Sequence, residues 1–322
     1  MTELATFTIL GVTVTRYALY ALLGFLAAAA LGAALAKRYG VRARAAVGFA
    51  VLAGVLGLLA GRAVYCLVRR DSLFFSDMGE FLGLAPLFDF TVGGVSVVGA
   101  VLGVALAALA CRLLTRRPAS AYMDCAVLPG LAYYAFMRFI EPLSGQGYGD
   151  LMTQEALCFY PLCRMNDWGD WTLSVSFIEG VLAVAVLFSL AFIAKKCRRS
   201  GTLTLYAATL LAATQIIPES LRCDDVLYIF IFARVTHIGC AVLLFTALLT
   251  ALLHGVGNGL RGRTVVMELA LSLLGLGVCI GTIFALDKTN LPPLAVYAVL
   301  LAALAALTTL NCRRIQKEDL RA

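Results

Sequence analysis

The residues best suited to chemistry in this sequence are ionisable side chains inside or beside long apolar runs. Arg138 and Glu141 are three residues apart, and so are Glu219 and Arg222. In hydrocarbon such a group costs at least about 2.5–3.5 kcal/mol, so it should face other helices or a wet cavity. Five further side chains of this kind are Arg62, Asp124, Glu179, Arg234 and His237.

Arginines and carboxylates at one depth suit the binding of an anionic head group. A guanidinium binds phosphate through two parallel hydrogen bonds, and Arg62, Arg138 and Arg222 are all predicted near one membrane boundary. Arg234 and His237 are predicted deeper, about 12–17 Å from the start of their helix. Alternatively, each spaced pair neutralises itself at a helix end while the arginine stem reaches water. That alternative explains any single pair, whereas convergence at one depth favours a phospholipid site.

The apolar runs that carry these residues predict an all-α polytopic membrane protein. The chain has 322 residues, of which 61% are hydrophobic and 14% charged, whereas about 25% are charged in soluble domains. The runs reach the length of about 20 residues that crosses a bilayer, and helices satisfy their own backbone groups in lipid. About nine transmembrane helices are expected, over residues 17–36, 46–67, 93–111, 121–140, 173–194, 201–218, 226–252, 264–286 and 292–311.

The basic residues predict the orientation of these helices. Short basic clusters follow the odd-numbered helices, as expected of cytoplasmic loops. They lie within residues 37–44, 112–117, 195–199, 261–263 and 313–321. The N-terminus is therefore expected outside and the C-terminus in the cytoplasm, so that the two longest loops, 68–92 and 141–172, face outward.

Charge and cysteine patterns argue against several other functions. The net charge of +7 lies in separate clusters and not in a basic stripe interleaved with aromatic residues, so no nucleic-acid partner is expected. The sequence contains no CxxC or Cys/His metal spacing, and neither metal nor cofactor is expected. Cys158 and Cys163 share an outward loop and could pair in an oxidising compartment. A small-solute transporter would show polar residues mid-membrane in several helices or a repeated half, and the sequence shows neither.

A set of short motifs runs in order along residues 10–252. It comprises the segment Arg16 to Phe25, Gly61-Arg62 with Tyr65, Gly93-Gly94 with Ser96, Asp124, the segment Arg138 to Gly149, Glu179-Gly180, and Glu219 to Arg222. These motifs resemble those of the prolipoprotein diacylglyceryl transferases. Members of that family are bacterial membrane enzymes that move diacylglycerol from phosphatidylglycerol to the lipobox cysteine of a prolipoprotein.

The resemblance implies an architecture, a location and partners. Residues 1–255 would form a seven-helix transferase-like core, and residues 256–322 would add two helices and a basic cytoplasmic tail. The protein would span the bacterial cytoplasmic (inner) membrane several times. Its partners would be the anionic phospholipid phosphatidylglycerol and prolipoprotein substrates.

The resemblance also implies the residues of a site. The positions with an implied catalytic role are Arg138, Glu141 and Glu219. The positions with an implied substrate-binding role are Arg62, Tyr20, Gly93, Gly94, Ser96, Gln146, Gln215 and Arg222.

Several positions depart from the family pattern. Val98 stands where the family has a histidine, and Glu141 stands for the first asparagine of its arginine-bearing signature. Gln146 replaces the glutamate of that signature, and Gln215 replaces the arginine that opens a second motif. Tyr20 lies one residue before the place expected for a family tyrosine.

These departures leave two functions open. Forming a thioether needs a thiolate, and an ordinary thiol has a pKa of about 8.5, so a base must assist. Cations must also stabilise the departing glycerol phosphate. Glu141, Glu219 or His237 could serve as the base. The sequence therefore predicts transfer of a diacylglyceryl group or a variant of that reaction, and the alternative is a non-catalytic paralogue that binds phospholipid or lipoprotein.

Overall fold

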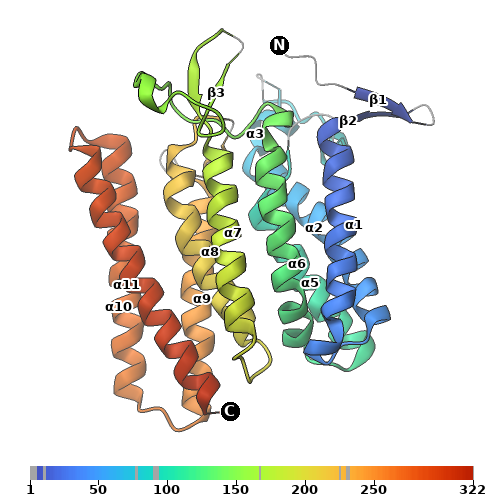
Figure 1. The fold of residues 1–322 in the computed structure, drawn as a ribbon, viewed down its shortest axis with the longest axis vertical. Helices are drawn as coiled ribbons and strands as arrows, with labels where there is room; N and C mark the ends of the chain where they lie inside the picture. The colour runs from blue at the N-terminus through green and yellow to red at the C-terminus, as the bar shows by residue number, and fades with distance from the viewer. Residues whose placement is uncertain are drawn as a thin grey trace. The chain divides into compact units, whose positions relative to one another are not determined.

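The structure is a computed structural model that describes residues 6–9, 12–76, 79–89, 94–166, 168–224, 226–229 and 233–321, most of them helical. Its long helices are α1 (Arg16–Leu35), α2 (Ala43–Val68), α5 (Val97–Thr115), α6 (Ala119–Ile140), α7 (Val175–Ala194), α8 (Thr202–Leu221), α9 (Val235–Gly257), α10 (Gly262–Lys288) and α11 (Pro293–Leu320) (Figure 1).

Among the described residues, seven helices are long and apolar enough to cross a membrane. They are α1 with the 3-10 turn η1 (Ala36–Tyr39) that continues it, α2, α5, α7, α9, α10 and α11. The predicted all-α polytopic membrane protein is therefore confirmed. The two remaining long helices, α6 and α8, have 22 and 20 residues and are less apolar because they carry polar and charged side chains.

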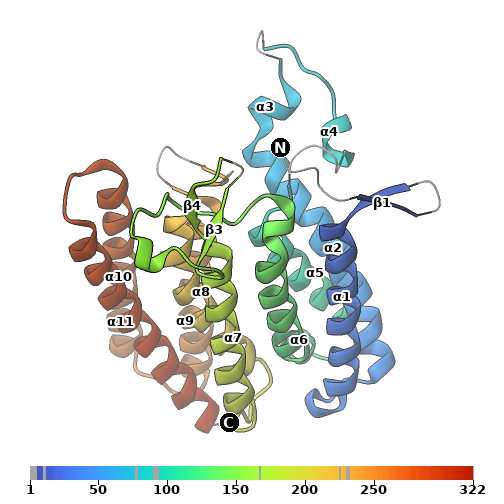
Figure 2. The same ribbon diagram turned by 45° about the horizontal axis from the view of Figure 1, so that its top comes forward.

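Short elements occupy the connections between the long helices. Helices α3 (Arg70–Phe74) and α4 (Ala85–Phe88) lie beyond the end of α2 (Figure 2). Between α6 and α7 the chain forms the 3-10 turns η2 (Glu141–Ser144) and η3 (Glu155–Leu157) and an antiparallel hairpin, β3 (Cys163–Met165) with β4 (Trp171–Leu173). A second antiparallel hairpin, β1 (Thr6–Ile9) with β2 (Val12–Thr15), precedes α1.

The predicted start of one helix is wrong. The helix expected over 226–252 is α9, which begins only at Val235. Tyr228 and Arg234 form an isolated antiparallel bridge, since the aromatic and β-branched residues of this run also suit extended backbone. Arg234 therefore precedes α9 and His237 lies in its first turn, so neither lies deep along the helix as predicted.

The predicted end of the last helix is also wrong. Helix α11 does not stop near residue 311 but continues to Leu320. Asn311, Arg314 and Glu318 follow one another at spacings of three and four, and all three are buried. One face of this extension therefore packs inside the protein as an amphipathic helix does, where the sequence suggested a basic tail.

The chain forms two compact units. Unit 1 comprises Met1–Ala28, Val127–Val226 and Cys240–Ala322, and unit 2 comprises Ala29–Ala126 and Leu227–Gly239. Each unit is built around its own buried core.

Unit 2 is built on the close packing of α2 against α5. Two glycines of α5 face α2, and a Cβ atom at Gly99 or Gly103 would collide with the carbonyl oxygens of Ala60 or Leu56. Small residues at such a crossing allow backbones to approach, which is how helices associate where lipid offers no hydrophobic driving force. The core of this unit comprises Ala36, Val41, Ala46, Phe49, Ala107, Ala108, Cys111, Ala121, Tyr122 and Cys125.

Unit 1 packs α8 against both α7 and α11, and α10 against α11 (Figure 1). Its core comprises Ala212, Ile216, Cys240, Leu244, Leu276, Cys279, Leu300, Leu304 and Leu307. Five of these nine residues come from α10 and α11, two come from α9 and two from α8. The C-terminal helix pair therefore shares one core with α8.

Polar contacts also tie α11 into unit 1. The Asp319 carboxylate accepts hydrogen bonds from the backbone N–H groups of Arg198 and Arg199 and from the Thr202 hydroxyl, at 2.8 to 3.2 Å. It thereby holds the turn before α8, and the first residue of that helix, against α11.

A buried ion-pair network lies one turn earlier on α11. Arg314 Nε donates to Glu268 Oε2 on α10 at 2.8 Å, and Arg314 Nη1 donates to Glu318 Oε1 at 3.3 Å. The Asn258 side chain, which follows α9, donates to Glu318 Oε2 at 3.1 Å. Three helix ends are therefore joined by charge as well as by apolar packing.

Candidate functional site

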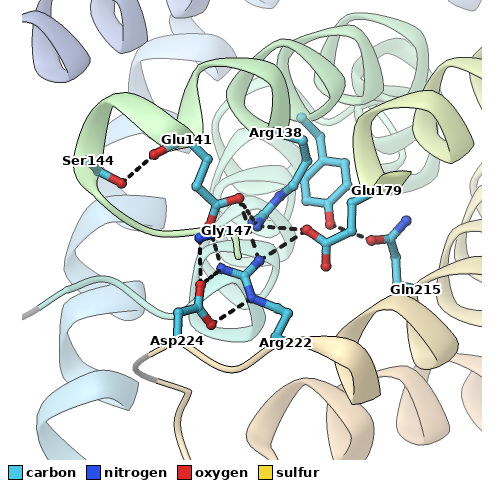
Figure 3. Close-up of polar contacts among 9 residues, drawn as sticks. Arg138, Glu141, Ser144, Gly147, Glu179, Gln215, Arg222 and Asp224 are labelled. Carbon is cyan, nitrogen blue, oxygen red and sulfur yellow. Dashed lines mark hydrogen bonds and ion pairs between the residues drawn. The ribbon is translucent and has the colours of Figure 1, made fainter. Parts of the chain in front are cut away.

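A cluster of buried charges in unit 1 brings together four chain segments. Arg138 lies in the last turn of α6, and Glu141 opens η2 directly after it. Glu179 lies in α7. Arg222 follows the last residue of α8, with Asp224 two residues further on. Figure 3 shows the side chains of these five residues converging; we call them the charge cluster.

Glu141 connects the two arginines. Arg138 Nη1 donates to Glu141 Oε2 at 2.6 Å, which confirms the contact expected from their spacing. Arg222 Nη2 donates to Glu141 Oε1, also at 2.6 Å. Each carboxylate oxygen of Glu141 thus binds a different guanidinium.

Glu179 provides a second link between the same arginines. Its Oε2 accepts from Arg138 Nη1 and from Arg222 Nη1, at 3.1 Å in both cases. The Glu179 side chain is only 2% exposed. A carboxylate this deeply buried needs such paired cations to remain charged.

Asp224 completes the cluster from the loop after α8. Its carboxylate accepts from Arg222 through two guanidinium nitrogens and from the backbone N–H of Gly147 at 2.7 Å. Burial lowers the pKa of Arg222, but its hydrogen bonds to Asp224 and the charges of Glu141 and Glu179 raise that pKa above its ordinary value. Arg222 therefore stays charged.

Gly147 has a conformation and a position that require glycine. Its φ is +86°, and a Cβ atom there would lie 2.6 Å from Ser176 Cβ and 3.4 Å from Glu141 Cδ. The Ser176 hydroxyl beside it is fully buried and has no hydrogen-bond partner among the described residues.

Tyr134 extends the cluster along α6. The Arg138 guanidinium carbon lies 5.0 Å from the centre of the Tyr134 ring, and the Tyr134 hydroxyl donates to Gln215 Oε1 at 2.8 Å. The Gln215 Nε2 atom has no partner in the part of the chain that the structure describes. Gln215 therefore contacts the cluster through Tyr134.

The other predicted residues of unit 1 lie as follows. Glu219 is buried in the last turn of α8. Gln146 is half-buried beside Gly147. Tyr20 lies on α1 and is 41% exposed.

A second group of predicted residues lies in unit 2. Arg62 is 1% exposed and donates to the backbone oxygens of Pro86, Asp89 and Gly94 at 2.5, 2.6 and 3.1 Å. Its guanidinium also lies over the ring of Tyr65, 5.4 Å from the centre. Arg62 thus holds the loop that leads into α5.

The motif around Gly94 ends at the start of α5. Ser96 is buried, and its backbone N–H donates to Gly61 O at 3.0 Å, whereas Gly93 lies outside the described residues. The methyl groups of Val98 pack on Gly239 in the first turn of α9. This turn also contains His237, which is buried.

Two members of the charge cluster, Glu179 and Asp224, were absent from the residues assigned to the site from sequence. Glu179 carried a usable signal, because it is a carboxylate inside an apolar run. Asp224 lies in the loop after α8 and carried no comparable signal. Among the described residues, no group of three metal-ligating side chains could hold a metal ion.

The model of the prolipoprotein diacylglyceryl transferase family matches residues 5–253, and no individual curated protein matches significantly. The matched segment contains the whole charge cluster and ends before α10 and α11. The chain therefore belongs to the prolipoprotein diacylglyceryl transferase family.

Proposed function

We propose that this protein transfers a diacylglyceryl group from a membrane phospholipid to the lipobox cysteine of a prolipoprotein, and that the charge cluster binds the phosphate. The observation that carries the proposal is the pairing of Arg138 and Arg222 across Glu141. Two guanidinium groups held this way present several N–H donors to one anion. Phosphatidylglycerol is the donor that the family resemblance implies.

The reaction makes two demands on these residues. The cysteine sulfur forms a bond to the terminal glycerol carbon of the diacylglyceryl group while the bond from that carbon to the phosphate oxygen breaks. The departing glycerol phosphate takes up the electron pair, and Arg138 and Arg222 stabilise its charge. The thiol proton passes to a carboxylate, and we assign this role to Glu141 or Glu219 because Val98 occupies the family's histidine position.

The remaining site residues have binding roles in this proposal. Tyr20, Gln146 and Gln215 contact the substrate in unit 1. Gly93, Gly94 and Ser96 bind substrate in unit 2, where Arg62 holds the loop at Gly94. Arg62 acts there through backbone oxygens, to which its guanidinium already donates.

A reconstituted transfer assay tests the function. Full-length protein in liposomes with phosphatidylglycerol and a lipobox peptide should yield the thioether-linked peptide, detected by mass spectrometry. Arg138→Lys should lower the rate by about 10²–10³-fold, the usual effect of removing one donor to a developing anion. Arg70→Lys, at an exposed ion pair with Asp71, should leave it unchanged.

A second function, phospholipid binding without transfer, is favoured by one observation. Both arginines of the cluster already bind carboxylates, and the family's histidine is absent. This alternative predicts that the protein binds lipid in an Arg138-dependent way but forms no lipidated peptide. That result, in protein that unfolds cooperatively on heating, would contradict transfer.

We further propose that α6 and α8 also span the bacterial cytoplasmic membrane, which gives nine spans with an outer N-terminus and a cytoplasmic C-terminus. The alternation of basic clusters along the sequence supports this orientation. Residues 1–255 would then hold the transferase function, and residues 256–322 would be an addition to it.

Cysteine labelling should reveal this orientation. Cys223 follows α8 and is exposed, whereas Cys197 lies in the turn before α8. In single-cysteine variants, a membrane-impermeant maleimide should label Cys223 in intact spheroplasts and Cys197 only after permeabilisation. The reverse pattern would mean the opposite orientation, and a variant that keeps only the buried Cys66 should stay unlabelled in both.

A further inference from the structure

The hairpin between α6 and α7 leaves one backbone edge open. Strand β4 has a neighbour on each side, because it pairs with β3 on one side and Thr172 bridges Leu151 on the other. Among the residues that the structure describes, β3 pairs with β4 alone. The open edge of a strand presents backbone N–H and C=O groups to which another extended chain can bond.

The register of the hairpin identifies the groups that face outward. The Ser174 N–H donates to Leu162 O at 2.9 Å. The Asn166 N–H likewise donates to Asp170 O at 2.9 Å. Along an antiparallel strand, residues that bond to one neighbour alternate with residues whose N–H and C=O point the other way. Met165 therefore directs both of its backbone groups to the open edge.

The carbonyl of Cys163 faces the same edge, two residues before Met165. The Cys163 N–H is already bonded to Phe159 O at 2.9 Å. The edge therefore offers one N–H donor and two carbonyl acceptors. A docked antiparallel strand would use them through two alternate residues, one that exchanges two hydrogen bonds with Met165 and one that donates to Cys163.

The same connection exposes large apolar side chains. Met165 is 53% exposed, Tyr160 82% and Trp168 87%. The hairpin lies beyond the ends of α7 and α8 (Figures 1 and 2), so the hydrocarbon around the helices does not cover these side chains. Apolar groups exposed outside lipid are typical of a surface that binds another protein.

Backbone contacts connect the hairpin to the charge cluster. Strand β4 continues through Ser174 into α7, which carries Glu179. On the other side of β4, the Gly149 N–H donates to Leu173 O at 2.8 Å, and Gly149 forms a bridge with Arg222. About four strand spacings, or about 19 Å, therefore separate Arg222 from a chain docked on β3. About six extended residues cover that distance.

We propose that the open edge of β3 binds the acceptor prolipoprotein as an added antiparallel strand, through backbone groups about six residues after the lipobox cysteine. The proposed function supplies this acceptor and places its cysteine at the charge cluster, and the inference rests on it. The apolar segment of an exported precursor precedes its cleavage region and stays in lipid. The residues after the cysteine are therefore the ones that reach the hairpin. Backbone pairing suits many acceptors, since it does not depend on their side chains.

Peptides of different length test this docking without the reaction. Lipobox peptides with serine in place of the cysteine end about two or about ten residues after that position. Their binding to full-length protein in a maltoside detergent is measured by fluorescence anisotropy. The long peptide should bind at least about tenfold more tightly, the effect expected of the few backbone hydrogen bonds at the edge. Equal affinities would overturn the proposal.

Methylation of single peptide nitrogens shows whether the contact is a strand. Each methyl group removes one N–H, so it should weaken binding about 3–10-fold at alternate residues of the docked stretch. The residues between them should tolerate methylation. The protein is the same throughout this series, so its folding does not affect the result. Weakening at consecutive residues, or at none, would contradict strand pairing.

Two variants of Met165 provide the matching test on the protein. Met165→Pro removes the outward N–H and keeps the hydrogen bonds to β4, since edge strands tolerate proline. It should weaken binding of the long peptide about 3–10-fold and leave the short peptide unaffected. Met165→Ala removes the exposed side chain but keeps the N–H, and should retain most of the affinity. Equal losses for the two variants would overturn a backbone contact.

The transfer assay separates this inference from the proposed function. Equal thioether formation from low concentrations of short and long cysteine peptides, in wild type and Met165→Pro, would leave transfer standing and refute the docking. Binding of the long serine peptide with the alternate pattern, but no product from the cysteine peptide, would support docking and contradict transfer.

A third measurement tests whether lipid covers the hairpin instead. In a Trp171→Phe variant, Trp168 is the sole tryptophan. Its fluorescence in liposomes should resist quenching by brominated phospholipid and should change when the long serine peptide binds. Strong quenching by the brominated lipid would place the hairpin in the membrane and overturn the docking.

Discussion

Replacing Arg222 by methionine should lower the free energy of unfolding by about 3–5 kcal/mol, because removing one partner of a buried ion pair leaves uncompensated charge. Arg222 donates to Glu141, Glu179 and Asp224, and all three carboxylates are buried. Methionine fills a similar volume, so lost packing adds little. Denaturant or thermal unfolding of the detergent-solubilised protein measures the change.

A matched control for this variant lies on the protein surface. Arg70 pairs with Asp71, and their side chains are 68% and 84% exposed. Arg70→Met should cost at most about 1 kcal/mol. Adding Glu141→Gln to Arg222→Met should recover part of the loss, since it removes one of the stranded charges. Equal stability of the Arg222 and Arg70 variants would mean that the cluster does not depend on Arg222.

Arg314→Met should have a comparable effect at the far end of α8, again about 3–5 kcal/mol. Arg314 is the cation between Glu268 and Glu318, and its side chain is 4% exposed. In the Arg314→Met variant, the carboxylates of Glu268 and Glu318 stay buried but lose this cation. The loss should appear in the same unfolding transition as that of Arg222→Met, because α8 packs on α11 in unit 1.

The neighbouring residue provides the control. Arg313 lies on the same helix but is exposed, so Arg313→Met should change stability by no more than about 0.5 kcal/mol. Adding Glu318→Gln to Arg314→Met should restore part of the stability. A separate, earlier transition for the Arg314 variant would show that α10 and α11 unfold independently of the segment matched by the family.

Much of the fold was predictable because a long apolar run in lipid satisfies its own backbone hydrogen bonds only as a helix. The spacing of Arg138 and Glu141 also predicted their contact, which the structure confirms. Helical spacing suggested that Glu219 and Arg222 would likewise form a local pair. Arg222, however, lies past the end of α8 with a ψ of 138°, so helical geometry does not govern its side chain. Its guanidinium reaches Glu141, 81 residues earlier, and no local pattern encodes such a contact.

The errors in helix boundaries have a related cause. Hydropathy alone could not separate the apolar run before Val235 from the helix that follows it, since extended and helical segments can be equally apolar. At the end of α11, basic residues suggested a solvated tail. The buried face of Asn311, Arg314 and Glu318 depends on partners in other helices. A charged residue in an apolar sequence indicates that its burial would cost free energy, but the sequence does not show which residue pairs with it and offsets that cost.

The contacts of Asp319 with the turn before α8 also impose an order on biogenesis. Asp319 lies 117 residues after Thr202, and its carboxylate accepts a hydrogen bond from the Thr202 hydroxyl. At typical translation speeds of 5–20 residues per second, the ribosome needs roughly 6–23 s to cover that distance. During this interval the turn before nascent α8 lacks its carboxylate, and water or lipid phosphate must accept from the N–H groups of Arg198 and Arg199. The turn between α7 and α8 is therefore complete only after translation has passed residue 319.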